Sequence, residues 1–97
     1  MIQVFLPSQL ESYTGGVREV SLDFADQLFA DKQEITVADV VSQLEHRYRG
    51  LAFRIVDEQN RIRRHIAIFV GENMVRELSV PLDQNARVQI VGALSGG

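Results

Sequence analysis

Residues 36–48 read TVADVVSQLEHRY, and this segment decides the fold of the chain. Its apolar residues recur at spacings of three, four, seven and eleven from the first, which places them on one stripe of a helix. They are Val37, Val40, Val41, Leu44 and Tyr48. Thr36 and Asp39 resemble an N-terminal capping pair, and Gly50 is placed to end the helix in a left-handed conformation. We therefore expect one amphipathic helix with a single buried face.

Two strands are expected before this helix. Ile2–Leu6 is apolar and rich in β-branched and aromatic residues, and Arg18–Phe24 alternates apolar with polar side chains. The paired glycines that end Ser8–Gly16 permit positive φ, so this stretch is expected to be a loop that joins the strands into an antiparallel hairpin. Residues 25–35 have no clean period, and either a short helical turn or an extended loop fits them.

Further strands are expected after the helix. Ile66–Val70 alternates, and Met74–Glu77 is a candidate for a short strand that pairs back on it. Pro81–Ala86 is expected to be a loop, and Arg87–Leu94 is expected to be the last strand. The pattern predicts an α+β domain, in which one main helix packs across one face of a sheet.

The composition bounds the class of protein. The 97 residues suffice for one domain, 1–97, and the content of 45% hydrophobic and 24% charged residues is ordinary for a globular chain. The apolar runs are far shorter than the ~20 residues that span a bilayer, and no basic and apolar leader opens the sequence, so no membrane association is expected. With no cysteine, the chain has neither disulfides nor thiolates, which favours a cytoplasmic location.

Charge is unevenly distributed along the chain. Residues 1–45 carry two basic and eight acidic side chains, whereas residues 46–65 carry six arginines against two acids. The net charge of −3 argues against nucleic-acid binding, which depends on a broad positive field. The cluster of Arg61, Arg63 and Arg64 has two interpretations, a docking patch for an acidic partner or a charged segment that keeps a sheet edge from pairing.

Residues that could carry catalysis or hold a metal are few. The two imidazoles, His46 and His65, do not have the spacing of zinc ligands. No Gly-x-Ser-x-Gly elbow exists for a nucleophilic serine, and the pair Gly15-Gly16 is not followed by the Gly-Lys-Ser/Thr of a phosphate loop. We therefore expect no catalytic residue, no metal site and no bound cofactor in this chain.

Phe69 differs from its neighbours in the strand that contains it. Alternation directs Ile66, Ile68 and Val70 toward the core and Phe69 to the opposite face. An aromatic side chain on an outer face indicates a docking surface, unless a loop or a terminus of the chain covers it.

The last residues, Ser95-Gly96-Gly97, have a specific physical interpretation. Two residues without a Cβ form a thread that fits a narrow channel and adopts many backbone angles. Residues 92–97 are expected to form a flexible tail, which would reach ~20 Å beyond the sheet at ~3.3 Å per residue. This pattern indicates a rigid domain that delivers its own terminal carboxylate to the active site of another protein.

Four segments together resemble the ubiquitin-like sulfur carriers of the ThiS/MoaD family across nearly the whole chain. They are YTGG (13–16), LEHRYRGL (44–51), HIAIFVGEN (65–73) and VQIVGALSGG (88–97). The resemblance is closest to the longer carriers of the cysteine-biosynthesis and molybdopterin-related subgroup. Members usually have an Asp-Gly-Asp-type turn before the last strand. This chain has DQNA (83–86) there, and Asn85 is expected to take the left-handed conformation.

The resemblance implies a ubiquitin-like β-grasp fold, with a mixed sheet, and a chemical cycle centred on Gly97. A ubiquitin-activating-type adenylyltransferase would adenylate the Gly97 carboxylate with ATP, and a sulfur donor would displace AMP to leave a thiocarboxylate. Leu94, Ser95 and Gly96 would thread into the active site of this partner, while Phe69 and the arginine cluster dock against it. A downstream synthase would then accept the sulfur for cysteine, molybdopterin, thiamine or a related product.

Two other functions share these residues. A ubiquitin-like modifier would also be adenylated at Gly97 and would then form isopeptide bonds with lysines of target proteins. A plain interaction module would use its folded surface alone, and its terminal glycines would have no role.

Overall fold

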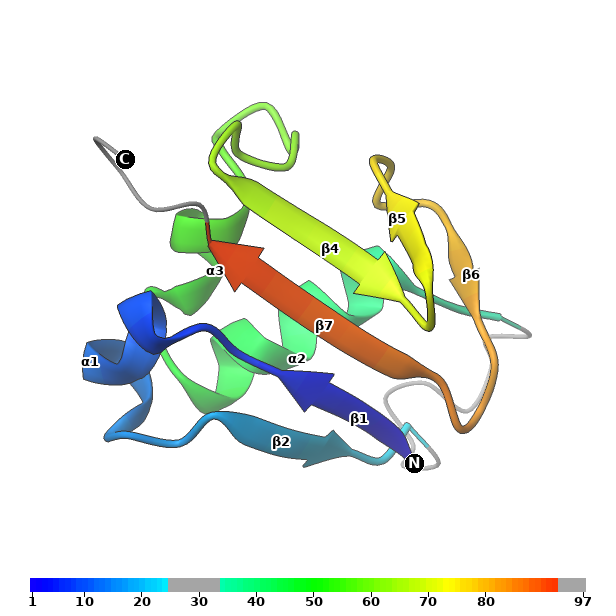
Figure 1. The fold of residues 1–97 in the computed structure, drawn as a ribbon, viewed down its shortest axis with the longest axis horizontal. Helices are drawn as coiled ribbons and strands as arrows, with labels where there is room; N and C mark the ends of the chain where they lie inside the picture. Colours follow the sequence, from blue (N-terminus) through cyan, green and yellow to red (C-terminus); the bar gives the residue numbers. More distant parts are fainter. Residues whose placement is uncertain (25–33, 93–97) are drawn as a thin grey trace.

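The computed structural model describes residues 1–24 and 34–92 of the chain, and within them five strands form one mixed sheet (Figure 1). The strand order is β2-β1-β7-β4-β5. The strands are β1 Ile2–Phe5, β2 Glu19–Leu22, β4 Ile66–Val70, β5 Asn73–Val75 and β7 Arg87–Gly92. Only β1 and β7 run parallel within this sheet, and the other neighbouring pairs are antiparallel. The expected mixed sheet is therefore present.

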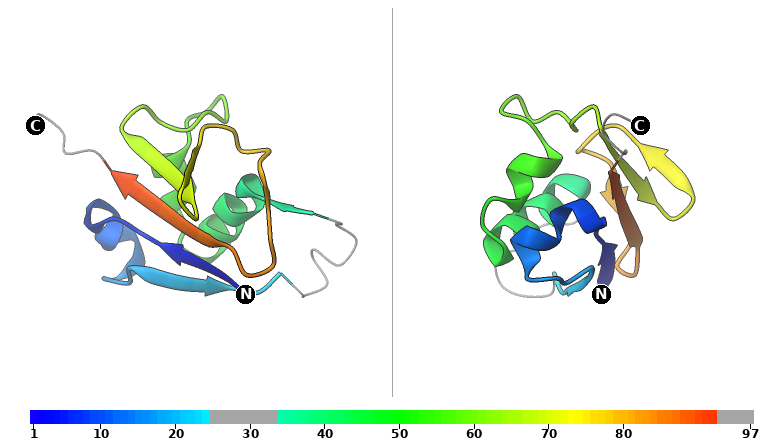
Figure 2. Two further views of the ribbon diagram at one scale, coloured as in Figure 1. Left: turned by 45° about the vertical axis from the view of Figure 1, so that its right-hand side comes forward. Right: turned by 60° about the vertical axis from the view of Figure 1, so that its left-hand side comes forward.

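Helix α2, Val37–Arg47, crosses one face of the sheet (Figure 2). The predicted capping pair forms, because the Thr36 backbone N–H donates to Asp39 Oδ2 at 2.8 Å while the Thr36 side chain accepts from the Asp39 backbone. Gly50 is left-handed, with φ 91°, as expected. It does not end α2, however, because Tyr48 caps α2 in an extended conformation and Gly50 starts a second helix, α3 Leu51–Ile55.

The hydrophobic core fills the space between the sheet and the helices. Alternate residues of β1, β2, β4 and β7 are buried, as the sequence pattern predicts. Val37, Val40, Val41 and Leu44 form the buried stripe of α2, and α3 adds Leu51 and Ile55, which are 0% exposed. The apolar stripe on 36–48 therefore decides which face of α2 meets the sheet.

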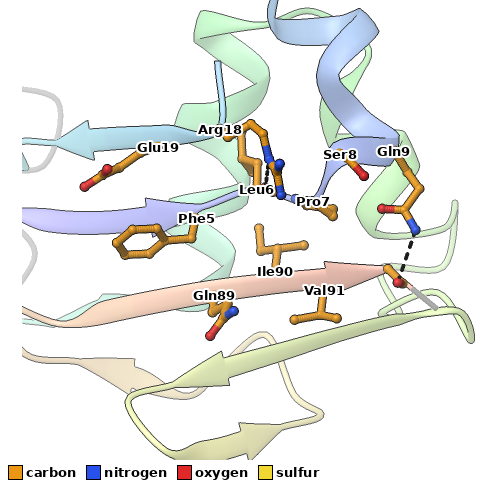
Figure 3. Close-up of a pocket in the computed structure, with 11 residues that line it drawn as sticks. Phe5, Leu6, Pro7, Ser8, Gln9, Arg18, Glu19, Gln89, Ile90 and Val91 are labelled. Carbon is orange, nitrogen blue, oxygen red and sulfur yellow. Dashed lines mark hydrogen bonds between the residues drawn. The ribbon is translucent and has the colours of Figure 1, made fainter. Parts of the chain in front are cut away.

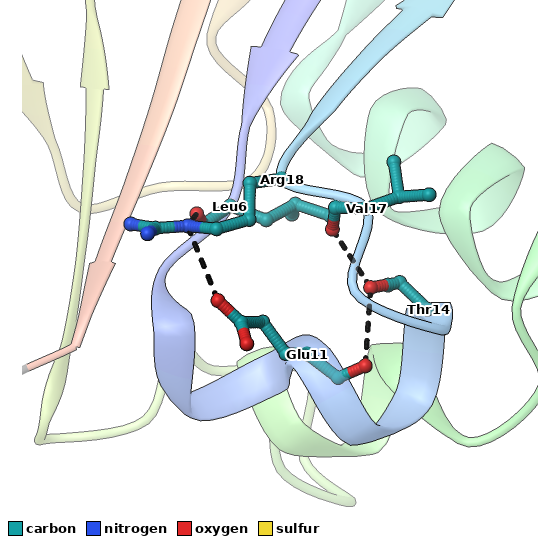
Figure 4. Close-up of polar contacts among 5 residues, drawn as sticks. All are labelled: Leu6, Glu11, Thr14, Val17 and Arg18. Atoms are coloured by element: carbon teal, nitrogen blue, oxygen red, sulfur yellow. Dashed lines mark hydrogen bonds and ion pairs between the residues drawn. The ribbon is translucent and has the colours of Figure 1, made fainter.

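The segment 8–16 is not the plain loop that the sequence predicts. It contains a 3-10 helix, η1 Ser8–Leu10, and a one-turn helix, α1 Glu11–Thr14. After these, the Thr14 hydroxyl donates to the Val17 carbonyl at 2.7 Å, and Arg18 Nε lies 3.7 Å from Glu11 Oε1 (Figure 4). A single turn of helix is too short to show a periodic pattern, so the sequence did not predict it.

Two short strands lie outside the main sheet. They are β3 Ile35–Thr36 and β6 Pro81–Leu82, which pair antiparallel. The sequence predicted a loop at Pro81–Ala86, and that prediction is wrong for its first two residues. A ladder of two residues carries no alternation of its own, so its existence depends on the distant partner strand. The rest of the open stretch 25–35, up to residue 33, lies outside the described residues.

The expectation of a left-handed Asn85 is wrong. Among the described residues other than glycine, positive φ occurs at Asn60 alone, with φ 62°. The Asn85 side chain instead accepts a hydrogen bond from the amino group of Met1, with a distance of 3.0 Å to Oδ1. The turn before β7 thus uses asparagine as a side-chain acceptor, and its backbone keeps an ordinary conformation.

The connectivity is that of a β-grasp fold, because the β1–β2 hairpin is followed by α2 and the last strand inserts between β1 and β4. The predicted fold class is confirmed. No helix within residues 1–24 and 34–92 has the length and apolar character needed to cross a membrane.

Candidate functional site: the end of strand β7 and the outer sheet face

Gly92, the first residue of the predicted tail 92–97, belongs instead to the central strand of the sheet. β7 lies between β1 and β4, and its last residue is Gly92, which pairs with Ile66 of β4. The tail residues that the sequence singled out follow this strand and lie outside the described residues. They are Leu94, Ser95, Gly96 and Gly97. The described part of the site is therefore the root of the tail, formed by Gly92 and the side chains around it.

The outer face of the sheet carries an apolar patch beside β7. Phe69 faces away from α2, as predicted, and its Cα partners are Gln89 on β7 and Met74 on β5. Its side chain is partly buried, whereas Met74 is 49% exposed and Val91 is 37% exposed. We name Phe69, Met74 and Val91 the outer patch. Neither Met74 nor Val91 was singled out from the sequence, although alternation along each strand is the signal that would have found them.

A cation limits the outer patch on the β1 side. Phe5 is in register with Gln89 on the same face, and the Arg87 guanidinium carbon lies 4.3 Å from the centre of the Phe5 ring. This cation–π contact covers the second aromatic side chain of the face. The apolar surface that remains open to a partner is thus on β4, β5 and the end of β7.

The three predicted docking arginines have different environments. Arg63 Nε donates to the Phe53 carbonyl at 2.6 Å, and its guanidinium carbon lies 4.5 Å from the Phe53 ring centre. Arg63 therefore fastens the segment after α3 to that helix. Arg61 and Arg64 are exposed, and the Arg64 side chain makes no hydrogen bond or ion pair within residues 1–24 and 34–92. These two are the arginines that remain available to a partner.

Asp57 orders the loop that carries these arginines. Its Oδ1 accepts from the Arg61 N–H at 3.0 Å and from the Gln59 N–H at 2.8 Å. The Arg61 hydrogen bond is the main cause that lowers the pKa of Asp57, with smaller contributions from Gln59 and from the charges of Arg61 and Arg63. The carboxylate thus remains ionised and keeps the loop closed.

Two hollows flank the root of the tail. One, of about 570 Å³, lies on the β1 side of β7 and is bordered by Phe5, Pro7 and Arg18 (Figure 3). The other, of about 270 Å³, is bordered by Tyr13, Arg54 and His65. In the second hollow, Arg54 Nε donates to the Tyr13 hydroxyl and its guanidinium carbon lies 5.3 Å from that ring centre.

Within the described ranges, no three histidine, aspartate or glutamate side chains gather as a metal site. His65 borders the smaller hollow, and His46 is exposed in the last turn of α2. The described residues provide a central strand that ends between two hollows, an apolar patch on the outer face of the sheet, and two exposed arginines in the loop before β4.

These features define a small ubiquitin-like domain with a carrier architecture, and the family can be stated. The model of the ThiS family matches residues 12–97. This chain belongs to the ThiS family, whose members are small carrier proteins and are not themselves enzymes. No curated protein matches the chain.

Solved structures agree with this assignment. The chain aligns over 100% of its length, and over 100% of the other chain, with a protein in the Amycolatopsis orientalis BexX/CysO complex, at 26% identity and a TM-score of 0.81. Mycobacterium tuberculosis CysO is 27% identical over 97% of this chain and 100% of that chain, with a TM-score of 0.77. SAMP1 from Haloferax volcanii, 17% identical over 99% and 98% of the chains, has a TM-score of 0.70 and shows the same fold.

Proposed function

We propose that this chain is a sulfur carrier whose Gly97 carboxylate is activated as an acyl-adenylate and then converted to a thiocarboxylate. Membership of the ThiS family supports the carrier class. The observation that carries the proposal is the position of the glycine-ended segment, which follows directly on the central strand of the sheet at Gly92. A rigid domain that holds the base of a narrow, unhindered terminus suits a protein that presents its own carboxylate to a partner.

The proposed reaction requires only the Gly97 carboxylate and a docking surface from this chain. A carboxylate oxygen of Gly97 attacks the α-phosphorus of ATP, and pyrophosphate leaves. Hydrosulfide then attacks the acyl carbon of the adenylate, AMP leaves, and sulfur replaces one oxygen of the carboxylate. Acid–base groups and the magnesium ion belong to the activating enzyme, which is consistent with a carrier that contributes one carboxylate and a docking surface.

The outer patch and the free arginines are the proposed docking surface for a ubiquitin-activating-type adenylyltransferase. Phe69, Met74 and Val91 supply an apolar centre, and Arg61 and Arg64 supply a charged rim. A relative of this chain, CysO, was solved in a complex with BexX, which supports the idea that this fold binds another protein. The sulfur would pass to a synthase of cysteine, molybdopterin, thiamine or a related product, in the cytoplasm.

Intact-mass analysis tests the proposal. The chain is incubated with the activating enzyme, ATP and sulfide, and the mass should increase by the difference between one sulfur and one oxygen atom. Deletion of Gly97 should abolish this product, whereas Gln84→Ala, at an exposed position in the turn before β7, should not. The melting temperature should be the same for all three proteins. As a positive control, the same enzyme is shown to consume ATP with a carrier that it is known to accept. If the mass of the wild-type chain is unchanged under these conditions, the proposal is contradicted.

The ubiquitin-like modifier is the alternative outcome. A modifier would also support ATP–pyrophosphate exchange, but cells would contain higher-mass conjugates in which Gly97 is joined to lysines of other proteins. If deletion of Gly97 removes such conjugates and no thiocarboxylate forms in the presence of sulfide, the modifier replaces the sulfur carrier as the function.

A further inference from the structure

Strand β1 leaves the sheet before its neighbour β7 ends. The register of this parallel pair stops at Phe5 opposite Gln89, whereas β7 continues to Gly92. Extension of the ladder would require an N–H at position 7 to donate to the Ile90 carbonyl. Position 7 is Pro7, which has no N–H, and the chain turns there into η1. The last residues of β7 therefore lose the support of β1 on one side.

A side chain from η1 takes the place of the missing strand. Gln9 Nε2 donates to the carbonyl of Gly92 at 3.2 Å (Figure 3). The contact joins residues 83 positions apart in the sequence. The Gly92 carbonyl belongs to the peptide group that leads into residue 93, so Gln9 holds the last described peptide of the strand.

Gly92 and Gln9 are also matched in shape. A Cβ built on Gly92 would lie 3.1 Å from Gln9 Cδ and Nε2 and 3.2 Å from Oε1. These distances are shorter than ordinary van der Waals contact, so the Gln9 amide lies flat against the space that a side chain at position 92 would fill. A side chain at position 92 would therefore require the Gln9 amide to shift by a few tenths of an ångström.

The two hollows at the root of the tail share Gln9 and Gly92 and no other bordering residue. The amide bridge is therefore the wall between the hollow beside Arg18 and the hollow beside Arg54 and His65. A partner that takes up the tail would meet this wall directly at the point where the tail leaves the sheet.

We propose that Gln9 is a positioning residue for the C-terminal tail. Its hydrogen bond restrains the rotation of the Gly92 peptide, which glycine would otherwise leave free, and so fixes the direction from which the tail enters the activating enzyme. This inference rests on the proposed function. Gln9 itself precedes the residues that match the family model, 12–97.

Adenylation kinetics test the role of Gln9. The variants Gln9→Ala and Gln9→Glu both lack the donor, and Gln84→Ala is the matched control, because Gln84 is exposed in the turn at the opposite end of β7. ATP–pyrophosphate exchange is measured while the carrier concentration is varied. Both Gln9 variants should raise KM for the carrier about threefold to tenfold, which is the effect of one net hydrogen bond. The value of kcat should stay within about twofold, because the bound tail is held by the enzyme.

A double-mutant cycle with Gly92→Ala gives a sharper test. The added methyl group should push the Gln9 amide by a few tenths of an ångström and weaken its 3.2 Å hydrogen bond, so Gly92→Ala alone should raise KM, at most by as much as Gln9→Ala. In the double variant the space is open, and KM should be no higher than in Gln9→Ala alone. Additive increases of KM, or an unchanged KM in both Gln9 variants, would overturn the proposal.

NMR separates a failure of this inference from a failure of the proposed function. In the free protein, Gln9→Ala should lower the order parameter of the Ala93 amide, which shares a peptide group with the Gly92 carbonyl, and should leave the melting temperature unchanged. Gln84→Ala should change neither quantity. If no activating enzyme accepts the wild-type chain, the sulfur-carrier function fails while this measurement still decides whether Gln9 restrains the tail. An unchanged Ala93 amide would overturn the restraint itself.

Discussion

Ile68 and Phe69 are neighbours in β4, but their side chains lie on opposite faces of the sheet and differ in burial. Ile68 is fully buried against the helices, whereas Phe69 lies partly exposed on the opposite face, between Gln89 and Met74. The inner face is closed by α2 and α3, and the outer face has no covering layer among the described residues (Figure 2). Adjacent residues of β4 thus have different roles, because Ile68 stabilises the fold and Phe69 lies on the face that we propose binds a partner.

The largest expected effect is the loss of an inner side chain. Ile68→Ala and Leu44→Ala should each lower the free energy of unfolding by ~2–5 kcal/mol, because each side chain is fully buried and its removal leaves a cavity. Urea denaturation followed by circular dichroism measures the change. A loss below ~0.5 kcal/mol at either position would mean that the helix and the sheet are not packed as described.

The matched change on the outer face should affect binding more than stability. Phe69→Ala removes a partly buried side chain, so we expect a loss of about 1 kcal/mol in unfolding free energy. The same variant should raise KM for the carrier in adenylation about tenfold, because aromatic residues at the centre of an interface carry most of its binding energy. Melting curves and adenylation kinetics on this one variant suffice. A stability loss of ~3–5 kcal/mol would place Phe69 with the core instead.

Arg63 and Arg64 should differ in the same way, because the first contributes to stability and the second to binding. Arg63→Ala removes the contacts with Phe53 and should lower stability by about 1 kcal/mol, with little effect on the rate of association. Arg64→Ala should leave the melting temperature unchanged and should slow association with the activating enzyme, most clearly at low salt. Stopped-flow association at two ionic strengths distinguishes them. Equal effects of the two variants on the association rate would contradict the prediction that Arg64 acts in binding and Arg63 does not.

The smallest expected effect concerns a surface carboxylate on the helical side. Glu45 accepts hydrogen bonds from the N–H of Gly50, at 3.0 and 3.1 Å to its two oxygens, and from the N–H of Ala52 at 3.0 Å. These bonds, the Gly50 bond first, lower the pKa of Glu45 from its ordinary value of 4.5. A carboxylate whose pKa is lower in the folded state adds stability above the unfolded pKa, and that stability is lost as the pH falls through the folded pKa.

We therefore expect Glu45→Gln to lower the urea midpoint slightly at about pH 7, and the difference from the wild-type chain to shrink below pH 4.5 and to disappear once the carboxylate is protonated in the folded state as well. The amide oxygen still accepts a hydrogen bond, so the variant removes mainly the charge. Glu58→Gln, at an exposed position in the loop after α3, is the control. A difference that persists unchanged at low pH would show that the charge of Glu45 has no part in holding the start of α3.

The helix and the buried faces of the strands were predictable because each depends on residues close together in the sequence. The capping contact between Thr36 and Asp39 spans three positions, and the alternation of Ile66–Val70 is visible within one strand. The α+β class followed from these local patterns, whereas the β-grasp fold was implied by the family resemblance. The family resemblance supplied the role of Gly97, which no spacing in the chain assigns.

The sequence by itself determined which faces of α2 and of the strands are apolar, because burial imposes a period that a short segment displays. Only the tertiary structure decided what those faces meet. It paired β1 with β7, fastened Arg63 to Phe53 while leaving Arg64 free, and brought Gln9 to Gly92. A hydrogen bond between residues so far apart leaves no local pattern. A polar side chain in a short helix looks the same in the sequence whether or not it has a distant partner. The partner is set by where Pro7 ends β1 and where the sheet brings Gly92.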